Sequence, residues 1–193
     1  MNKIILISII TLSFAGCDLF TTRNAENPDQ TRSNFQPPVE PAVVIDNLKN
    51  SLSDKNVQNY ISCFVDTLFS ERSFNFSASS DALTRFDIFL SWGLNEERRY
   101  FNSIANKVPV DFPISLTLSN QNYSSLSGDS LIYSATYLIN LPVSTGDQFP
   151  QNYGGNLQFN MLRDSRQEWV IYFWKDTKSE TLPSWSELKG SSY

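Results

Sequence analysis

The stretch Glu168-Trp-Val-Ile-Tyr-Phe-Trp-Lys-Asp176 decides the fold, because six consecutive apolar or aromatic residues lie between charged ends. These six residues are β-branched or aromatic and include no Gly or Pro, which is typical of a β-strand. Alternation sorts the side chains onto two faces: Trp169, Ile171 and Phe173, opposite Val170, Tyr172 and Trp174. Both faces are apolar, so we expect a central strand that is covered on both sides.

Three alternating segments precede this stretch. Apolar residues recur at every second position in segments 114–118, 130–141 and 157–161, which predicts further strands. The longest of the three has one expected core face, made of Leu131, Tyr133, Ala135, Tyr137, Ile139 and Leu141. A polar turn at 120–129 and a loop at 142–155 are predicted to connect them.

The first half of the chain has helical spacing instead. Pro41 is a good first helical residue, and the apolar positions that follow it predict a helix over 42–53. Asn56 is a good N-cap for a second helix, and the two helices form a hairpin. The apolar stripe expected on the second helix is Val57, Tyr60, Ile61, Phe64 and Leu68. Residues 71–77 alternate weakly and predict a short strand.

Two more helices are predicted before the strands begin. One should carry Leu83, Phe86, Phe89 and Leu90 on one face, and Gly93 should end it. Asn95 is a candidate cap for the next helix, which has Tyr100, Phe101 and Ile104 as its apolar face. After the strands, the tail 181–188 is expected to fold back and anchor itself through Trp185 and Leu188. Helices followed by a meander of strands predict an α+β domain over 42–193, with N-terminal helices packed on an antiparallel sheet.

This order of elements resembles the nuclear transport factor 2-like fold, which ketosteroid isomerases and SnoaL-type polyketide cyclases share. Three parts of the chain carry the resemblance: the helical pair with Leu48, Leu52, Lys55-Asn56, Tyr60 and Cys63-Phe64, and the segments 155–159 and 169–174. It covers about residues 42–176. It implies helices in the concavity of a strongly curved sheet, which together form a cone. The helix around 83–90 departs from the minimal layout and is expected to cap or fill the cone mouth.

The N-terminus has the pattern of an export signal over residues 1–16. Lys3 provides the positive start, and Ile4–Phe14 is an apolar stretch too short for a transmembrane helix. Small residues directly before Cys17 resemble a bacterial lipobox, although Phe14 replaces the usual Leu. The alternative is an ordinary cleaved signal with an incidental Cys. Lipidation of Cys17 would anchor the chain in a bilayer, with residues 17–41 as a flexible, Pro-rich tether.

A tethered lipoprotein of this kind resembles envelope lipoproteins of Gram-negative bacteria, facing the periplasm or the cell surface. The Asp18 that follows Cys17 resembles an inner-membrane retention signal of enteric bacteria, but that rule is not general, so either membrane remains open. Removing residues 1–16 takes away only the charge of Lys3, which changes the net charge from −5 to −6. An acidic chain of this kind argues against nucleic-acid binding.

The chain has no His, which excludes Ser-His-Asp and Cys-His catalysis and zinc sites built on His. We therefore expect no metal and no cofactor. Cys63 lies in an apolar-periodic segment and is interpreted as a core residue. Glu96 and Glu97, beside Arg98-Arg99, are interpreted as a solvated charge cluster at a helix end.

In the resembling family, a carboxylate in the cone often acts as a base while a Tyr or an acid polarises a carbonyl. Asp66 and Asp111 are the candidate acids here, but no spacing singles out a catalytic residue. The side chains that could line a pocket are Tyr60, Asp66, Trp92, Tyr100, Tyr133, Tyr137, Tyr172 and Trp174. A filled aromatic core is the alternative explanation for the same residues.

Three functions follow from these observations. The first is non-enzymatic binding of a small apolar ligand or an envelope protein by a membrane-anchored domain. The second is an isomerase-like or SnoaL-like enzyme with a Tyr/Asp pocket, which requires an apolar cavity containing a desolvated carboxylate. The third is a scaffold or assembly subunit, which an exposed apolar sheet face would support.

Overall fold

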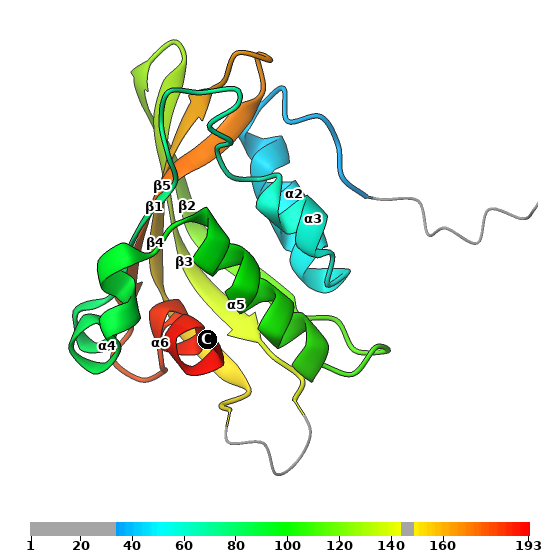
Figure 1. The fold of residues 1–193 in the computed structure, drawn as a ribbon, viewed down its shortest axis with the longest axis vertical. Coiled ribbons are helices and arrows are strands. Elements are labelled where there is room, and N and C mark those ends of the chain that lie inside the picture. The colour runs from blue at the N-terminus through cyan, green and yellow to red at the C-terminus, as the bar shows by residue number, and fades with distance from the viewer. Residues whose placement is uncertain (1–33, 144–148) are drawn as a thin grey trace, which may run out of the picture. The chain divides into compact units, whose positions relative to one another are not determined.

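The computed structural model describes residues 34–143 and 149–193. The predicted signal 1–16, Cys17 and most of the tether therefore lie outside the described residues. Figure 1 shows helices gathered against one side of a long, curved sheet. The predicted α+β domain with helices on a curved sheet is confirmed.

The five strands form one sheet in the order β1-β5-β4-β3-β2. Their bounds are β1 Asn75–Ser77, β2 Ser115–Ser127, β3 Ser130–Asn140, β4 Asn152–Arg163 and β5 Trp169–Lys178. The sheet is mixed rather than wholly antiparallel, because β1 pairs with β5 in parallel. Phe64 also pairs with Ile171 in parallel, on the same edge of β5 as β1. The stretch around Trp169–Trp174 thus has a neighbour on each edge, which confirms the prediction of a central strand, but its two faces are not equally covered, because Tyr172 and Phe173 are only half-buried.

A bulge in β5 corrects the predicted alternation. Met161 pairs with Ile171 but Asn160 pairs with Phe173, so β5 contains one extra residue at this point. An extra residue shifts every later side chain to the other face. Trp174 therefore shares the inner face with Ile171, and Phe173 does not.

The helical elements are α2 Pro41–Ser53, α3 Val57–Ile61, α4 Ser80–Arg85, the 3-10 helix η1 Asp87–Ser91, α5 Leu94–Lys107 and α6 Trp185–Ser192. Helix α2 packs on β2 and β5, and α6 packs on β4 and β5. Their buried faces and the inner face of the sheet form one core. Cys63 lies in this core, as predicted, and burial raises the pKa of its thiol.

Two predicted helices are shorter than the apolar pattern suggested. The second helix ends at Ile61, because Val65 donates to Ile171 O and Ile171 donates to Cys63 O, which adds this segment to the sheet edge. Leu68, expected in the core, is 82% exposed. The next predicted helix is broken at Phe86, whose extended backbone separates α4 from η1 and leaves Leu90 85% exposed.

Strand β2 contradicts the predicted polar turn at 120–129. The strand continues to Ser127 and pairs with β3 throughout, with irregularities after Ser119 and Ser125. Its outer half is exposed on both faces, so it has no apolar alternation to mark it as a strand. Helix α5 also starts earlier than expected: Gly93 is its N-cap, and Gly93 N–H donates to Glu96.

The tail forms α6, which packs on β4 and β5, as the prediction from Trp185 and Leu188 required. Both side chains are fully buried. Ser184 caps the helix by accepting from Glu187 N, and the Glu187 carboxylate accepts from Ser184 N in return. This reciprocal capping fixes the start of a helix of only eight residues.

Candidate functional site

The interior holds a buried carboxylate, that of Glu97. It belongs to α5, on the same face as Tyr100, Phe101 and Ile104. One oxygen accepts from Tyr60 Oη at 2.7 Å. The other accepts from Trp92 Nε1 at 2.7 Å and from Lys189 Nζ at 2.7 Å. Every oxygen of this carboxylate is thus occupied by protein donors.

The ammonium of Lys189, in α6, forms an ion pair with the Glu97 carboxylate. Both side chains are 0% exposed. The Nζ atom also lies 3.5 Å from the centroid of the Trp174 ring and 3.7 Å from that of Phe76. Burial lowers the pKa of Lys189 to about 8, and the Glu97 carboxylate opposes that shift. The aromatic rings and the carboxylate together replace the hydration that the ammonium has lost.

A second buried carboxylate, Asp176 of β5, lies against the first turn of α6. Tyr137 Oη donates to one oxygen at 2.7 Å, and Ser186 donates to the other through its backbone N–H at 2.8 Å and its hydroxyl at 2.5 Å. Tyr137 in turn accepts from Trp185 N at 2.6 Å. Burial raises the pKa of Asp176, while the hydrogen bonds from Ser186 and Tyr137 oppose the rise.

The tyrosine hydroxyls of both sites stay protonated at neutral pH. Burial, and then the nearby Glu97 carboxylate, raises the pKa of Tyr60 and Tyr100. Burial and Asp176 do the same for Tyr137. None of these hydroxyls is suited to ionise as a base near pH 7.

Four of the predicted pocket residues come together around the Glu97–Lys189 pair: Tyr60, Trp92, Tyr100 and Trp174. Tyr137 belongs to the Asp176 site instead. Tyr133 lies elsewhere on the inner face, where its hydroxyl donates to Gln121 at 2.8 Å. Tyr172, at the bulge, lies under the guanidinium of Arg72 at 4.6 Å.

The two candidate acids lie outside the interior. Asp66 accepts from Leu68 N at 2.9 Å in a turn, and Asp111 is exposed in the loop after α5. The acids that are buried, Glu97 and Asp176, were not singled out from the sequence. Glu97 was interpreted as part of a solvated cluster, which is wrong because its side chain faces the core.

Spacing could have revealed all three charged residues of the interior. Glu97 precedes Tyr100 and Phe101 by three and four positions, which places it on their face of the helix. Lys189 follows Trp185 by four positions, and Asp176 follows Trp174 by two along a strand. A charged residue at a core position is a signal that a buried partner exists.

The interior is filled by these side chains. Trp174, Trp185, Tyr60 and Tyr100 are among the largest fully buried residues. Trp185 Nε1 donates to Tyr100 Oη at 2.7 Å, and the Trp174 and Trp185 rings meet edge to face at 4.6 Å. Lys189, Tyr60 and Trp92 occupy both oxygens of the buried Glu97 carboxylate, so neither oxygen is free for a ligand.

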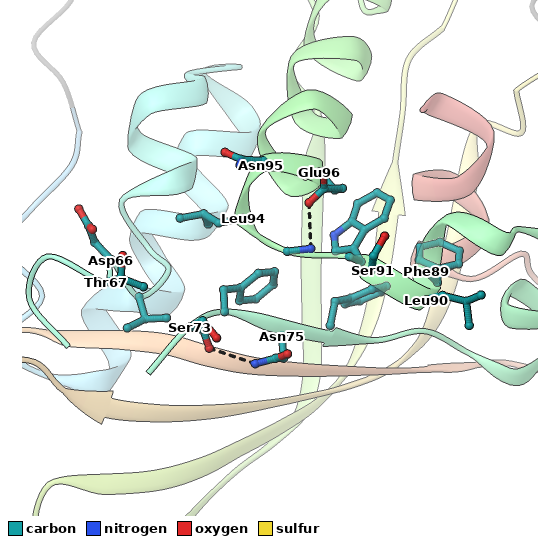
Figure 2. A pocket seen from close by; sticks show the side chains of 15 residues that line it. Asp66, Thr67, Ser73, Asn75, Phe89, Leu90, Ser91, Leu94, Asn95 and Glu96 are labelled. Atoms are coloured by element: carbon teal, nitrogen blue, oxygen red, sulfur yellow. Dashed lines mark hydrogen bonds between the residues drawn. The ribbon is translucent and has the colours of Figure 1, made fainter. Parts of the chain in front are cut away.

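An open groove lies on the surface nearby, and Figure 2 shows it from close by. It has a volume of about 590 Å³ and is bordered by segments 65–67, 73–76 and 89–96. Asp66 and Glu96 contribute carboxylates, whereas Leu90 and Leu94 contribute apolar surface. The groove is open and mixed in polarity, which favours an extended or polar binding partner over a small apolar ligand.

No group of three or more metal-ligating side chains is present among residues 34–143 and 149–193. Within the same residues, no helix combines the length and the apolar character needed to cross a bilayer.

Several solved structures have a similar arrangement of helices and sheet. A proposed aromatic-ring hydroxylase from Novosphingobium aromaticivorans is similar in structure, with a TM-score of 0.57 and 11% identity over 79% of this chain and 96% of that chain. A proposed scytalone dehydratase from the same organism gives a TM-score of 0.55 and 11% identity over 70% and 79% of the two chains. No family model matches the sequence, and no curated protein matches it significantly.

A nuclear transport factor 2-like superfamily protein from Salmonella enterica is also similar, with a TM-score of 0.51 and 10% identity over 72% of this chain and 88% of that one. The chain therefore has the nuclear transport factor 2-like fold, as the element order predicted. Identities this low establish the fold alone.

Proposed function

We propose that this chain is a membrane-anchored envelope lipoprotein whose domain binds a partner or ligand and carries out no reaction. The observation that carries this proposal is the position of Lys189, which is fully buried and paired with Glu97 in the interior of the domain. In a catalytic cone, the base must be within reach of a substrate atom. Here the acceptor atoms of both buried carboxylates are already bonded to protein donors.

Binding would then take place on the surface. The groove beside β1 is the best candidate, since it combines volume, two carboxylates and apolar side chains in one recess. Leu90, at 85% exposure, offers an apolar contact that costs little to desolvate. A ligand that suits this lining is elongated, partly apolar and not anionic.

The membrane anchor rests on the sequence pattern at Cys17. Acylation of this residue would hold the domain at a bilayer in the bacterial envelope, on the periplasmic side or at the cell surface. Fractionation of cells that produce the full chain tests this part. We expect the chain in the membrane fraction and a Cys17→Ser variant in the released fraction.

The binding site can be mapped by nuclear magnetic resonance with a library of small fragments and short peptides. We expect amide shift changes at residues 73–76 and 89–96, with no changes on the inner face of β3 or in α6. Thr67→Arg should block the groove, and Lys175→Met, on the exposed outer face of the sheet, is a matched control. Shifts concentrated on α6 and β3 would contradict the proposal.

A second candidate function is proton transfer of the isomerase or dehydratase type. The lowered pKa of Lys189, about 8, beside a carboxylate and two tyrosines favours it, because such groups can move protons near neutral pH. One similar structure is a proposed scytalone dehydratase. This function requires a substrate to displace at least one of the protein donors that occupy Glu97.

Deuterium exchange distinguishes the two candidates. Carbonyl compounds with acidic C–H bonds can be incubated with the protein in heavy water, and their proton signals followed. We expect no exchange above the protein-free rate. Exchange that disappears in Glu97→Gln but persists in Glu96→Gln would establish the enzymatic function instead.

A further inference from the structure

The loop that joins α5 to β2 exposes two apolar side chains. Val110 is 85% exposed and Phe112 is 56% exposed, with the exposed Asp111 between them. Pro109 and Pro113 flank these residues and restrict the backbone at both ends. Isolated exposed apolar residues are ordinary, but two on one short loop form a small patch.

Lys55 holds this loop in one shape. Its ammonium donates to the carbonyl oxygens of Pro109 at 2.6 Å, Val110 at 2.9 Å and Phe112 at 2.8 Å. An ammonium has three donors, so each is satisfied by one carbonyl. Lys55 itself adopts a positive φ of 52° at the turn between α2 and α3, a conformation uncommon outside glycine. The loop is therefore pre-organised with its apolar side chains outward.

The described part of the chain begins at the same end of the domain. Asn34 Nδ2 donates to Asp54 Oδ2 at 3.3 Å, and Asp54 directly precedes Lys55. Figure 1 shows the loop after α5 extending on the side of α2 and α3, away from α4. Asn34, where the described residues begin, and the apolar loop thus lie on the same side of the domain.

Only residues 18–33 separate Cys17 from Asn34. Even fully extended, a segment of this length spans at most roughly 60 Å, so an anchor at Cys17 would hold this side of the domain towards the bilayer. Two exposed side chains give weak membrane affinity by themselves. A tether turns that weak contact into an intramolecular one with a high effective concentration.

We propose that the loop 109–113 is a second membrane contact, in which Val110 and Phe112 enter the lipid interface. This proposal rests on the lipid anchor at Cys17. The contact is apolar rather than electrostatic, because the ammonium of Lys55 is bonded to the loop itself and Asp111 is acidic. Phe is among the apolar side chains that peripheral proteins insert at the boundary between headgroups and acyl chains, so Phe112 is suited to this contact.

The test places a fluorescent Trp on the loop or on a control site of similar exposure. Val110→Trp is the test variant, and Leu68→Trp is its control, since Leu68 is 82% exposed but lies outside the groove, beside the β4–β5 hairpin at the other end of the sheet. Chains from Cys17 onward are coupled through that thiol to a maleimide lipid in phosphatidylcholine vesicles. The buried thiol of Cys63 does not compete. Bromine-labelled phosphatidylcholine then reports contact by quenching.

We expect bromolipid to quench the added fluorescence of Val110→Trp about twofold, with a blue shift, and to leave that of Leu68→Trp unchanged. A further Phe112→Ser change should weaken the quenching. Equal quenching of both sites, or none at Val110→Trp, would overturn the proposal, and the second result would favour a protein partner for the loop. Because the anchor is supplied chemically, these outcomes are independent of whether cells acylate Cys17.

Discussion

Glu97 and Asp176 are both buried carboxylates contacted by α6, yet the protein compensates them in different ways. Glu97 meets a cation, Lys189, in addition to Tyr60 and Trp92. Asp176 meets only neutral donors in direct contact, namely Tyr137 and Ser186. The first site is stabilised by charge and the second by hydrogen-bond geometry, so substitutions should separate the two.

The largest effect is expected from Lys189→Met, which leaves the Glu97 carboxylate buried without its cation. Breaking a buried pair by removing one partner costs about 3–5 kcal/mol in the free energy of unfolding. Urea unfolding measures this loss. Lys175→Met, on the exposed face of β5, should change stability by less than about 0.5 kcal/mol. A double Glu97→Met/Lys189→Met variant should recover much of the loss, and a loss at Lys189→Met below that of the control would contradict this account.

Asp176→Asn probes the second site, with an expected loss of about 1–3 kcal/mol. The amide has one acceptor oxygen instead of two, so its NH2 group must face either Tyr137 or the backbone N–H of Ser186. Asp129→Asn, in an exposed turn, is the matched control, with both measured by thermal unfolding. An Asn variant more stable than the parent chain would contradict this account. It would show that the cost of burying the Asp176 charge exceeds the value of its hydrogen bonds.

Gly190→Ala alters α6, the helix that contributes Lys189 to the Glu97 site and Ser186 to the Asp176 site. A Cβ at this position would lie 2.4 Å from the ring of Phe86, so α6 or the α4–η1 connection must shift. We expect a loss of about 1–2 kcal/mol, typical of overpacking. Gly128→Ala should be nearly neutral, because nothing lies within 4 Å of the added atom. Hydrogen exchange should show faster opening of α6 in the first variant alone, and unchanged exchange there would argue against tight packing at Phe86.

The smallest effect is a dependence on pH. The pKa of Lys189 is lowered to about 8 from 10.5 by burial, so the unfolded chain binds more protons between these values. Stability contributed by Lys189 must therefore rise with pH across this window. The difference in unfolding free energy between the parent chain and Lys189→Met should increase by about 1 kcal/mol from pH 8 to pH 9. A flat or falling difference would show that Glu97 outweighs the burial of the ammonium.

Periodicity predicted the parts of the fold in which one face is buried. The core face of β3 and the anchors Trp185 and Leu188 were all identified correctly, since each follows from spacing alone. Strand β2 could not be predicted in full, because its outer half has no buried face. The bulge at Tyr172 could not be predicted either, because residues 169–174 are apolar on both faces and a change of face does not alter the sequence pattern.

The interior site was less accessible to prediction. Aromatic composition indicated Tyr60, Trp92, Tyr100 and Trp174 but not the charges that they enclose. Glu97 stands among three other charged residues, which by themselves favour an exposed cluster. Only its spacing from Tyr100 and Phe101 indicates that it lies on the buried face of the helix. Lys189 and Glu97 are separated by most of the domain, so their pairing depends on tertiary structure.

That separation has a kinetic consequence. The Lys189–Glu97 contact joins residues 92 apart in sequence, and the Ser79–Ser186 contact joins residues 107 apart. Closing such long loops is entropically costly, so we expect these contacts to form after the folding transition state. Lys189→Met should then accelerate unfolding while leaving the refolding rate almost unchanged, as a chevron analysis would reveal. Helix α6 would thus set how long the folded state lasts rather than how quickly it is reached.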